Sequence, residues 1–390
     1  MVGQLLSDAA TAHPPVVGDE EKHDAHYTRR VLILTAEIGA GHTSTARALK
    51  RHLEGEDKTA QVHFAEPIKD VPSFARLPRL YRFMTAYMPV VWALFYYSRK
   101  RKLVRSLYGR FIRRRLRPAI AQLRLEEYDT VVITYSMYCN CIDSFTKAGV
   151  RTIVLVTDLF GGPHEWFAPG ADQYVVPTEQ MRKMAEACDI DSKRVLLRRL
   201  PTLASDIEPR AMWNADTALR ILIIGGSEGL GPLKAAARGI LRGRRKASVT
   251  VVCGNNARLK RRLQRSSAFT KGYVEEVATT YQDYDFVVTK PGSVTVMELL
   301  HQKVPFVLLP GIPGIEADNT RLFRRAHMPR IRSFREACLV PHRLVNRDLS
   351  LSLDGVRWLN ALSELRDSLP TDYVSIEEVA PLYRVTKLNV

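Results

Sequence analysis

Two stretches of the sequence decide the fold: RVLILTAEIGAGH at residues 30–42 and LRILIIGGSEGLGP at residues 219–232. Each stretch opens with a short apolar run that favours a buried β-strand and then passes into a glycine-rich turn. A helix is expected after each turn, at residues 43–53 and 232–242, and Pro232 suits the first turn of the second helix. Strand, glycine turn and helix form the opening unit of a doubly wound α/β domain, so the chain is expected to contain two of them.

Further apolar runs extend both units. The expected strands lie at residues 30–35, 130–134 and 152–157 in the first unit and at 219–224, 248–253, 286–289 and 306–309 in the second. Continuous apolar runs are typical of parallel strands that are covered on both faces. The turn-rich stretch 200–216 is expected to link the units. Because ligands bind at the carboxyl ends of parallel strands, two facing units would enclose a cleft.

Length, charge and cysteine content limit the possible functions. The chain has 390 residues, which is enough for about two domains of roughly 150 residues. Its net charge of +17 favours an anionic partner, such as phosphates, nucleic acid or an acidic lipid surface. The five cysteines include no CxxC pair, which indicates reduced thiols in a cytosolic protein. No apolar stretch is long enough for a transmembrane helix, and residues 1–30 lack the apolar core of a secretory signal.

The positive charge is concentrated in residues 71–125, the basic aromatic segment, which contains 14 Lys and Arg residues, ten aromatic residues and no Asp or Glu. Its apolar run 83–97 is too short to cross a bilayer and is interrupted by Pro89, and residues 98–117 are expected to form an amphipathic helix. An apolar face beside a cationic face favours contact with an anionic membrane surface. The alternative is a helix whose apolar stripe packs into the core.

Nucleic acid is not expected as a partner, because zinc-ligand spacing and RNA-binding aromatic motifs are absent from the sequence.

Five short motifs add chemical detail to the two units. They are Gly39-Ala40-Gly41-His42, Val156-Thr157-Asp158-Leu159, Gly225-Gly226-Ser227-Glu228-Gly229-Leu230-Gly231-Pro232, Val288-Thr289-Lys290-Pro291-Gly292-Ser293 and Gly314-Ile315-Glu316-Ala317-Asp318-Asn319. In this order and spacing they resemble the monogalactosyldiacylglycerol synthase family, a group of GT-B glycosyltransferases related to MurG. The resemblance covers residues 30–330.

The resemblance implies a GT-B fold, in which two Rossmann-like doubly wound domains face each other across a cleft. The implied division is a flexible tail at 1–28, an acceptor and membrane-contacting domain at 29–205, a nucleotide-sugar domain at 206–365, and a C-terminal tail at 366–390 that packs on the first domain. The implied reaction is the inverting transfer of galactose or glucose from a UDP-sugar to diacylglycerol, without a tightly bound cofactor or a metal. Such an enzyme would be cytoplasmic and peripheral on the inner face of the plasma membrane.

The sequence departs from the family pattern mainly on the acceptor side. Glu37 stands where the family has an aspartate, residues 135–138 replace a His-Pro pair, and Ser293 replaces a glycine. These differences leave open a polyprenyl-linked or small-molecule acceptor on the same fold. A basic protein that binds nucleic acid without catalysis is the remaining alternative.

Displacement at a sugar carbon requires a base that takes the proton from the acceptor hydroxyl. His42 is the first candidate, because it follows the glycine turn and because an imidazole titrates at about pH 6.5. His42 is expected to act either as this base or as a contact to a phosphate of the donor. Asp158 and Glu37 are the other catalytic candidates, either as the base or as residues that orient His42.

The donor diphosphate requires hydrogen-bond donors and positive charge. The amides of Gly226, Ser227 and Ser293 are expected to form its cradle, with Lys290 as an added cation. By resemblance, a loop at 272–274 would hold uracil through backbone groups. Glu316 and Asn319 would bind sugar, ribose or phosphate oxygens, with helix capping as the alternative. The complete set expected on the donor side is Gly41, Gly225, Gly226, Ser227, Glu228, Gly229, Tyr273, Val274, Lys290, Gly292, Ser293, Glu316 and Asn319.

Overall fold

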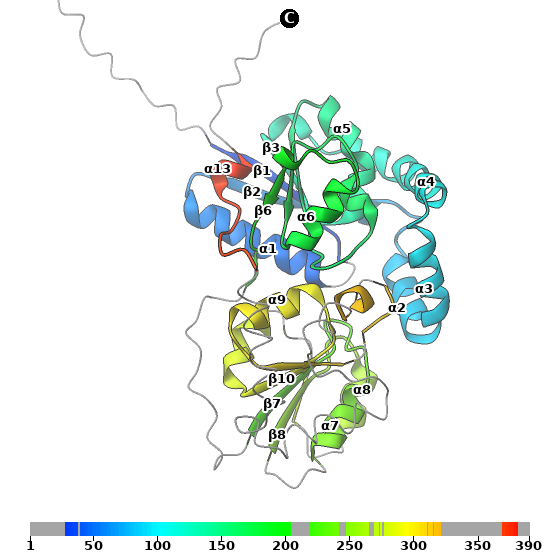
Figure 1. Cartoon of the computed structure of the whole chain (residues 1–390), viewed down its shortest axis with the longest axis vertical. Helices are drawn as coiled ribbons and strands as arrows, with labels where there is room; N and C mark the ends of the chain where they lie inside the picture. The colour runs from blue at the N-terminus through cyan, green and yellow to red at the C-terminus, as the bar shows by residue number, and fades with distance from the viewer. Residues whose placement is uncertain are drawn as a thin grey trace, which may run out of the picture.

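The computed structural model describes residues 28–37, 40–203, 219–241, 247–264, 269–272, 274, 277–309, 311–314, 316–320 and 369–380. The described residues form two parallel β-sheets with helices packed against them (Figure 1). The first unit, residues 28–203, occupies the upper part of Figure 1, and the second, residues 219–320, occupies the lower part. Helices α1 (Ala40–Glu56) and α9 (Ser293–His301) meet between the two sheets.

The first sheet has six strands in the order β2-β1-β3-β4-β5-β6. Their bounds are β1 Arg30–Leu34, β2 Gln61–Ala65, β3 Thr130–Ile133, β4 Arg151–Leu155, β5 Gln173–Val176 and β6 Val195–Leu197. Val31 and Ile33 of β1 pack in one cluster with α1, whereas Leu32 and Leu34 pack in another with α4 (Lys102–Ala121). Because successive side chains point to opposite faces, burial of both faces requires an uninterrupted apolar strand.

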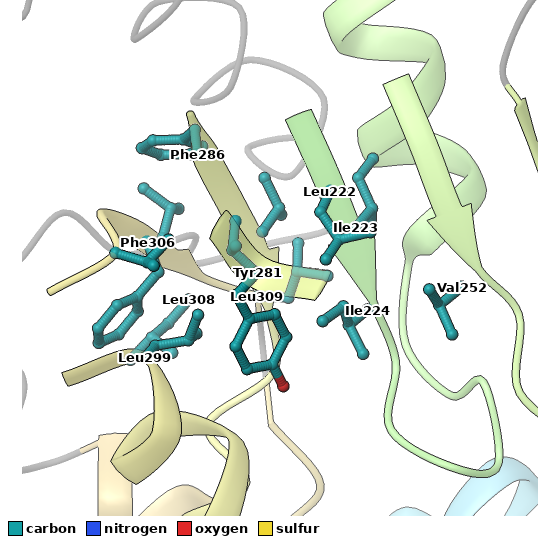
Figure 2. Close-up of a cluster of buried hydrophobic side chains, with 14 of the residues drawn as sticks. Leu222, Ile223, Ile224, Val252, Tyr281, Phe286, Leu299, Phe306, Leu308 and Leu309 are labelled. Carbon is teal, nitrogen blue, oxygen red and sulfur yellow. The ribbon is translucent and has the colours of Figure 1, made fainter. Parts of the chain in front are cut away.

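The second sheet has five strands in the order β11-β10-β7-β8-β9. Their bounds are β7 Leu219–Ile224, β8 Ala247–Val252, β9 Phe269–Lys271, β10 Phe286–Thr289 and β11 Phe306–Leu308. Figure 2 shows the side chains of its central strands packed against Tyr281 and Phe306, both of which are fully buried. The second unit therefore has a hydrophobic core of its own.

The remaining helices of the two units are short. The α-helices are α5 Ile142–Lys147, α6 Glu179–Glu186, α7 Leu233–Leu241 and α8 Ala257–Leu263. The 3-10 helices are η1 Pro67–Asp70, η2 Leu125–Glu127, η3 Ser136–Cys141, η4 His164–Phe167, η5 Ser192–Arg194 and η6 Val277–Asp283. None of the helices that the structure describes has both the length and the hydropathy to cross a bilayer.

The basic aromatic segment folds into three helices, α2 (Leu77–Tyr87), α3 (Pro89–Ser98) and α4. Pro89 divides the apolar run into two helices, since it occupies the first position of α3, where its missing N–H is not needed. Helix α4 differs from the expected helix at 98–117. It begins only after a turn at 99–101, and it continues past Pro118 to Ala121, although Pro118 has no N–H to bond the carbonyl of Arg114.

The apolar stripe of α4 is buried in the second half of the helix and exposed in the first half. Ile112 and Leu116 are 2% and 0% exposed and belong to the core of the first unit. Leu103 and Leu107, nine and five residues before Ile112, are 71% and 53% exposed. The second half of the helix therefore stabilises the domain, and the first half presents apolar side chains to the surroundings.

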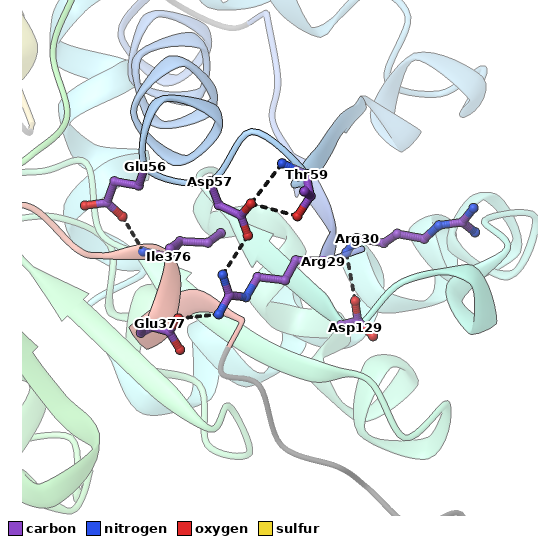
Figure 3. Close-up of polar contacts among 8 residues, drawn as sticks. All are labelled: Arg29, Arg30, Glu56, Asp57, Thr59, Asp129, Ile376 and Glu377. Atoms are coloured by element: carbon purple, nitrogen blue, oxygen red, sulfur yellow. Dashed lines mark hydrogen bonds and ion pairs between the residues drawn. The ribbon is translucent and has the colours of Figure 1, made fainter. Parts of the chain in front are cut away.

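The described C-terminal residues, 369–380, return to the first unit. Ser375 caps the N-terminus of helix α13 (Ile376–Val379) and forms a capping box with Glu378. Glu56 accepts a hydrogen bond of 2.6 Å from the Ile376 amide, and Arg29 bridges Asp57 and Glu377 (Figure 3). The expected domain boundaries at 205/206 and 365/366 lie outside the described residues.

Candidate active site

A pocket of about 250 Å³ lies between the two units. The second unit contributes the carboxyl ends of β7, β8 and β10, through Ile224, Val252 and Thr289. The first unit contributes the start of α1 and the residues that follow β4. Parallel sheets bind ligands at this edge, so the position of the pocket agrees with the cleft predicted from the sequence.

His42 lies at the start of α1 and lines the pocket. Its Nδ1 is 2.8 Å from the carbonyl oxygen of Thr134 and 2.9 Å from Oγ1 of Thr157. Because a carbonyl only accepts hydrogen bonds, Nδ1 carries the proton and Nε2 keeps a free lone pair. Burial beside Tyr135 and Trp166 lowers the pKa of His42 to about 4, against the opposing effect of the Thr134 bond. The imidazole is therefore neutral at pH 7 and able to accept a proton at Nε2.

Asp158 follows Thr157 and is 5% exposed in the same wall of the pocket. Its Oδ2 accepts a hydrogen bond of 2.7 Å from the indole nitrogen of Trp166. Burial, with a smaller contribution from Asp318, raises the pKa of Asp158 to about 7, although the Trp166 bond acts in the opposite direction. The first unit thus places two titratable groups of different pKa beside the pocket.

The glycine turn after β7 forms part of the opposite wall, with Gly226, Ser227 and Glu228 lining the pocket. The turn is closed by the amide of Gly229, which donates to the Gly226 carbonyl at 3.0 Å. Gly226 has a φ of 71°, in the left-handed region that favours glycine. A second glycine, Gly254 after β8, packs against this turn, and a Cβ there would lie 2.1 Å from the carbonyl oxygen of Ser227.

The N-terminus of α9 completes this wall. Gly292 occupies the N-cap position, so no side chain at that position accepts hydrogen bonds from the first-turn amides. Gly292, Ser293 and Val294 line the pocket. Free amides at a helix N-terminus, together with the helix dipole, make this end of α9 suited to bind an anion.

Lys290 and Glu316 form an ion pair at the edge of this wall, with Nζ 2.5 Å from Oε1. The other carboxylate oxygen of Glu316 accepts a hydrogen bond of 2.6 Å from the Ile312 amide. Both side chains line the pocket. The charge of Lys290 is therefore already balanced by Glu316, and the pair presents a polar rather than a strongly cationic surface to a ligand.

Comparison with known proteins covers both units. A family model described as monogalactosyldiacylglycerol (MGDG) synthase matches residues 42–201, and the glycosyltransferase family 28 C-terminal domain matches residues 220–346. The chain is similar to the MGDG synthase family of glycosyltransferases over its first unit and to glycosyltransferase family 28 over its second. The first matched stretch begins at His42, and the second contains the glycine turn and the N-terminus of α9. The resemblance expected from the five motifs is confirmed.

Several members of this family are similar to the chain over most of its length. MGDG synthase 1, chloroplastic, from Arabidopsis thaliana is 24% identical over 76% of the chain, which spans 61% of that protein. Processive diacylglycerol β-glucosyltransferase from Bacillus cereus (strain G9842) is 26% identical over 76% of the chain and 80% of that protein.

Solved structures confirm the GT-B fold. MurG from Acinetobacter baumannii matches with a TM-score of 0.54 at 16% identity and covers 91% of the chain and 98% of its own. Spinosyn rhamnosyltransferase SpnG complexed with thymidine diphosphate matches with a TM-score of 0.56 at 13% identity, covering 88% of the chain and 97% of its own. At these identities the likeness concerns the fold alone.

The pocket brings together most of the residues that the motifs singled out. From the predicted set, it is lined by Gly41, His42, Asp158, Gly226, Ser227, Glu228, Val274, Lys290, Gly292, Ser293 and Glu316. Tyr273 lies outside the described residues. Gly225 and Gly229 are needed for the tight packing of the turn. A Cβ at Gly225 would lie 2.6 Å from the carbonyl oxygen of Leu230, and a Cβ at Gly229 would lie 1.9 Å from the carbonyl oxygen of Cys253.

Two predicted site residues have other roles in the structure. Glu37 lies away from the pocket: its side chain is 72% exposed and pairs with Lys69 at 3.0 Å. We therefore leave it out of the catalytic residues. Asn319 is fully buried and braces the loop before α9, since its Nδ2 donates to the Pro291 carbonyl at 2.8 Å and to the Ser293 hydroxyl at 3.1 Å. It supports the wall of the pocket instead of forming its surface.

Arg47, Tyr81 and Gly254 are among the pocket residues that were not predicted as site residues. Gly254 was detectable, because it follows a predicted strand as the other two glycine turns do. Arg47 was detectable as well, because it follows His42 on the same predicted helix. Tyr81 had no such signal, since its neighbours in the sequence are the aromatic residues of the basic aromatic segment.

Proposed function

We propose that the chain transfers a hexose from a UDP-sugar to the free hydroxyl of diacylglycerol at a membrane surface. The observation that carries this proposal is one pocket with two chemically different walls: the imidazole of His42, protonated at Nδ1, on one side, and a glycine turn and a helix N-terminus on the other. The names of the relatives, MGDG synthase and diacylglycerol β-glucosyltransferase, support the lipid acceptor. In this proposal, residues 29–205 hold the acceptor and residues 206–365 hold the donor.

The second unit would bind the donor. The amides of Gly226 and Ser227 and the first turn of α9 would hydrogen-bond the diphosphate and stabilise the charge that develops on UDP as it leaves. Backbone amides and a helix dipole can supply this stabilisation without a metal. Glu316, fixed by Lys290 and the Ile312 amide, would accept hydrogen bonds from hydroxyls of the hexose or the ribose.

The first unit would activate the acceptor. As the lipid hydroxyl oxygen attacks the anomeric carbon, Nε2 of His42 takes the hydroxyl proton, and the bond from that carbon to the β-phosphate oxygen breaks with its electron pair on UDP. Attack opposite the leaving group inverts the anomeric configuration. The donor hexose is galactose or glucose, which differ in the orientation of one hydroxyl.

The pH dependence of kcat/KM should identify the base. A base acts in its unprotonated form, so activity falls as the pH decreases through its pKa. With His42 as the base, we expect kcat/KM to stay level from pH 8 to pH 5 and to fall only near pH 4. With Asp158 as the base, half of the activity would be lost at about pH 7. A pH–rate profile at saturating vesicle concentration distinguishes the two.

A product assay tests the proposed reaction. The purified chain is incubated with radiolabelled UDP-galactose or UDP-glucose and vesicles that contain diacylglycerol. We expect label in the chloroform-soluble fraction with one of the two donors, and a mass that corresponds to diacylglycerol plus hexose. Label that stays in the aqueous phase would indicate a small-molecule acceptor, and label found only when a polyprenyl-linked sugar is added would indicate a MurG-like acceptor. Either result would overturn the lipid assignment.

The basic aromatic segment is the proposed membrane contact. Within the described residues, all the exposed large apolar side chains except Phe64 lie between residues 80 and 111. They include Val90 and Leu94 of α3, which are 70% and 67% exposed. The exposed side chains Arg101, Lys102 and Arg110 lie in the same stretch of sequence. Apolar side chains flanked by cations fit the interface of an anionic membrane.

Replacing Val90 and Leu94 with aspartate should release the protein from anionic vesicles. Two apolar side chains that leave the interface cost about 2–3 kcal/mol, so we expect the vesicle partition coefficient to fall more than about tenfold. Sedimentation with phosphatidylglycerol vesicles measures the effect. Phe64→Asp is the matched control, because Phe64 is 42% exposed outside the segment. Unchanged binding of the double variant would show that another surface contacts the membrane.

A further inference from the structure

Tyr81 belongs to α2 in the basic aromatic segment, and its half-buried side chain lines the pocket together with His42 and Glu228. Its ring packs edge-on against Trp92 of α3, with ring centroids 5.2 Å apart. Tyr87, six residues later on the same helix, is 71% exposed. Helix α2 therefore presents one tyrosine to the pocket and another to the surroundings.

The hairpin formed by α2 and α3 reaches across to the second unit. Arg82, next to Tyr81, pairs with Glu228 of the glycine turn at 3.2 Å. At the other end of the hairpin, the Tyr96 hydroxyl and Lys100 contact Asp318 at 3.4 and 3.3 Å. These contacts hold Tyr81 at the boundary between the two walls of the pocket.

The Tyr81 hydroxyl is a hydrogen-bond donor that the protein leaves available. It donates no hydrogen bond to any residue in the part of the chain that the structure describes. Burial raises the pKa of this phenol, and the carboxylates of Glu316, Asp158 and Glu228 raise it further. The hydroxyl therefore keeps its proton at neutral pH and can donate it in a hydrogen bond.

The surrounding charges limit what this hydroxyl can bind. Two of the three carboxylates are balanced by cations, Glu228 by Arg82 and Glu316 by Lys290, so the hydroxyl faces a polar surface without excess positive charge for a phosphate. A neutral group with hydroxyl oxygens suits such a surface, and each of its oxygens can accept a hydrogen bond. In the proposed reaction, the hexose is the neutral polyhydroxyl group that must lie between the glycine turn and His42.

We propose that the Tyr81 hydroxyl donates a hydrogen bond to the hexose of the bound donor. This inference rests on the proposed function and extends it, because it assigns part of the sugar site to the helical hairpin that also carries the membrane-contacting side chains. Tyr81 is a substrate-binding residue in this proposal, and it does not take part in proton transfer.

Tyr81→Phe tests the assignment, because it removes the hydroxyl and keeps the ring that packs on Trp92. Binding of UDP, UDP-galactose and UDP-glucose is measured by isothermal titration calorimetry without an acceptor, and kcat/KM for the donor is measured with vesicles. We expect UDP affinity to stay unchanged, while affinity for the transferred UDP-hexose and kcat/KM fall about fivefold or more, as for the loss of one buried hydrogen bond. Tyr128→Phe is the matched control, because Tyr128 is half-buried outside both the pocket and the basic aromatic segment, and it should change none of these values.

The outcomes separate this inference from the proposed function. Equal UDP-hexose affinities of Tyr81→Phe and the unsubstituted chain would overturn the inference, even if labelled lipid is formed. An equal loss for UDP and UDP-hexose would also overturn it, because the hydroxyl would then act on the nucleotide. If the unsubstituted chain labelled lipid with neither donor, the proposed function would be contradicted. The hydrogen bond to the hexose would not be, because the binding measurements without an acceptor test it independently.

Discussion

Replacing His42 with glutamine is expected to lower kcat by about 10²- to 10⁴-fold, the range typical for the loss of a general base. Glutamine retains an amide N–H that can bond the Thr134 carbonyl, but it has no group that accepts a proton at neutral pH. The affinity for UDP should stay nearly unchanged, because His42 lies across the pocket from the glycine turn. Initial rates of hexose transfer and calorimetric titration with UDP measure the two effects.

Thr157→Val is the matched control for this prediction. It removes the hydroxyl 2.9 Å from Nδ1 and leaves the imidazole and its bond to Thr134 in place. We expect a much smaller decrease in kcat than for His42→Gln. If His42→Gln kept the turnover of the unsubstituted chain, Asp158 would replace His42 as the base.

Replacing Arg99 with methionine is expected to lower the free energy of unfolding by about 3–5 kcal/mol, the cost of leaving a buried charge without its partner. Arg99 donates hydrogen bonds of 2.7 and 3.1 Å to Glu165, which is 4% exposed. Its guanidinium also lies over the ring of Tyr108, 4.3 Å from the centroid. Urea denaturation measures the loss, which should be accompanied by weaker vesicle binding, because Arg99 anchors the end of α3.

Two further variants make this prediction specific. The double variant Arg99→Met/Glu165→Gln should recover most of the lost stability, because it removes both charges. Arg114→Met is the matched control, since Arg114 is an exposed cation on α4, and it should change the free energy of unfolding by less than about 0.5 kcal/mol. Similar decreases in the free energy of unfolding for Arg99→Met and Arg114→Met would show that the buried pair of Arg99 and Glu165 does not stabilise the α2–α3 hairpin.

The fold could be predicted where the chain is buried on both sides of a sheet. All seven strands expected from apolar runs are present, and their ends differ from the predicted ones by at most two residues. Four strands were not predicted: β2, β5, β6 and β9. β5 is only four residues long. In β2 the apolar residues are separated by Gln61 and His63, because only part of this edge strand is buried. β6 is only three residues long.

The candidate site could be predicted where backbone geometry fixes the residue. The glycine turn, the N-terminus of α9 and His42 all follow a strand, so sequence position determines that they meet at one edge of the sheets. Roles that depend on the direction of a side chain were harder to predict from the sequence. Glu316 and Asn319 are three residues apart, yet one lines the pocket and the other is buried behind it. Tyr81 reaches the pocket only through packing between two helices, which no local pattern records.

The most direct test of the account is a crystal structure of the chain with UDP bound. We expect the diphosphate to contact the amides of Gly226 and Ser227 and the first turn of α9, with His42 facing it across the pocket. The same structure should show the Tyr81 hydroxyl beside the position of the missing hexose. A nucleotide bound anywhere other than between the glycine turn and α9 would contradict the account.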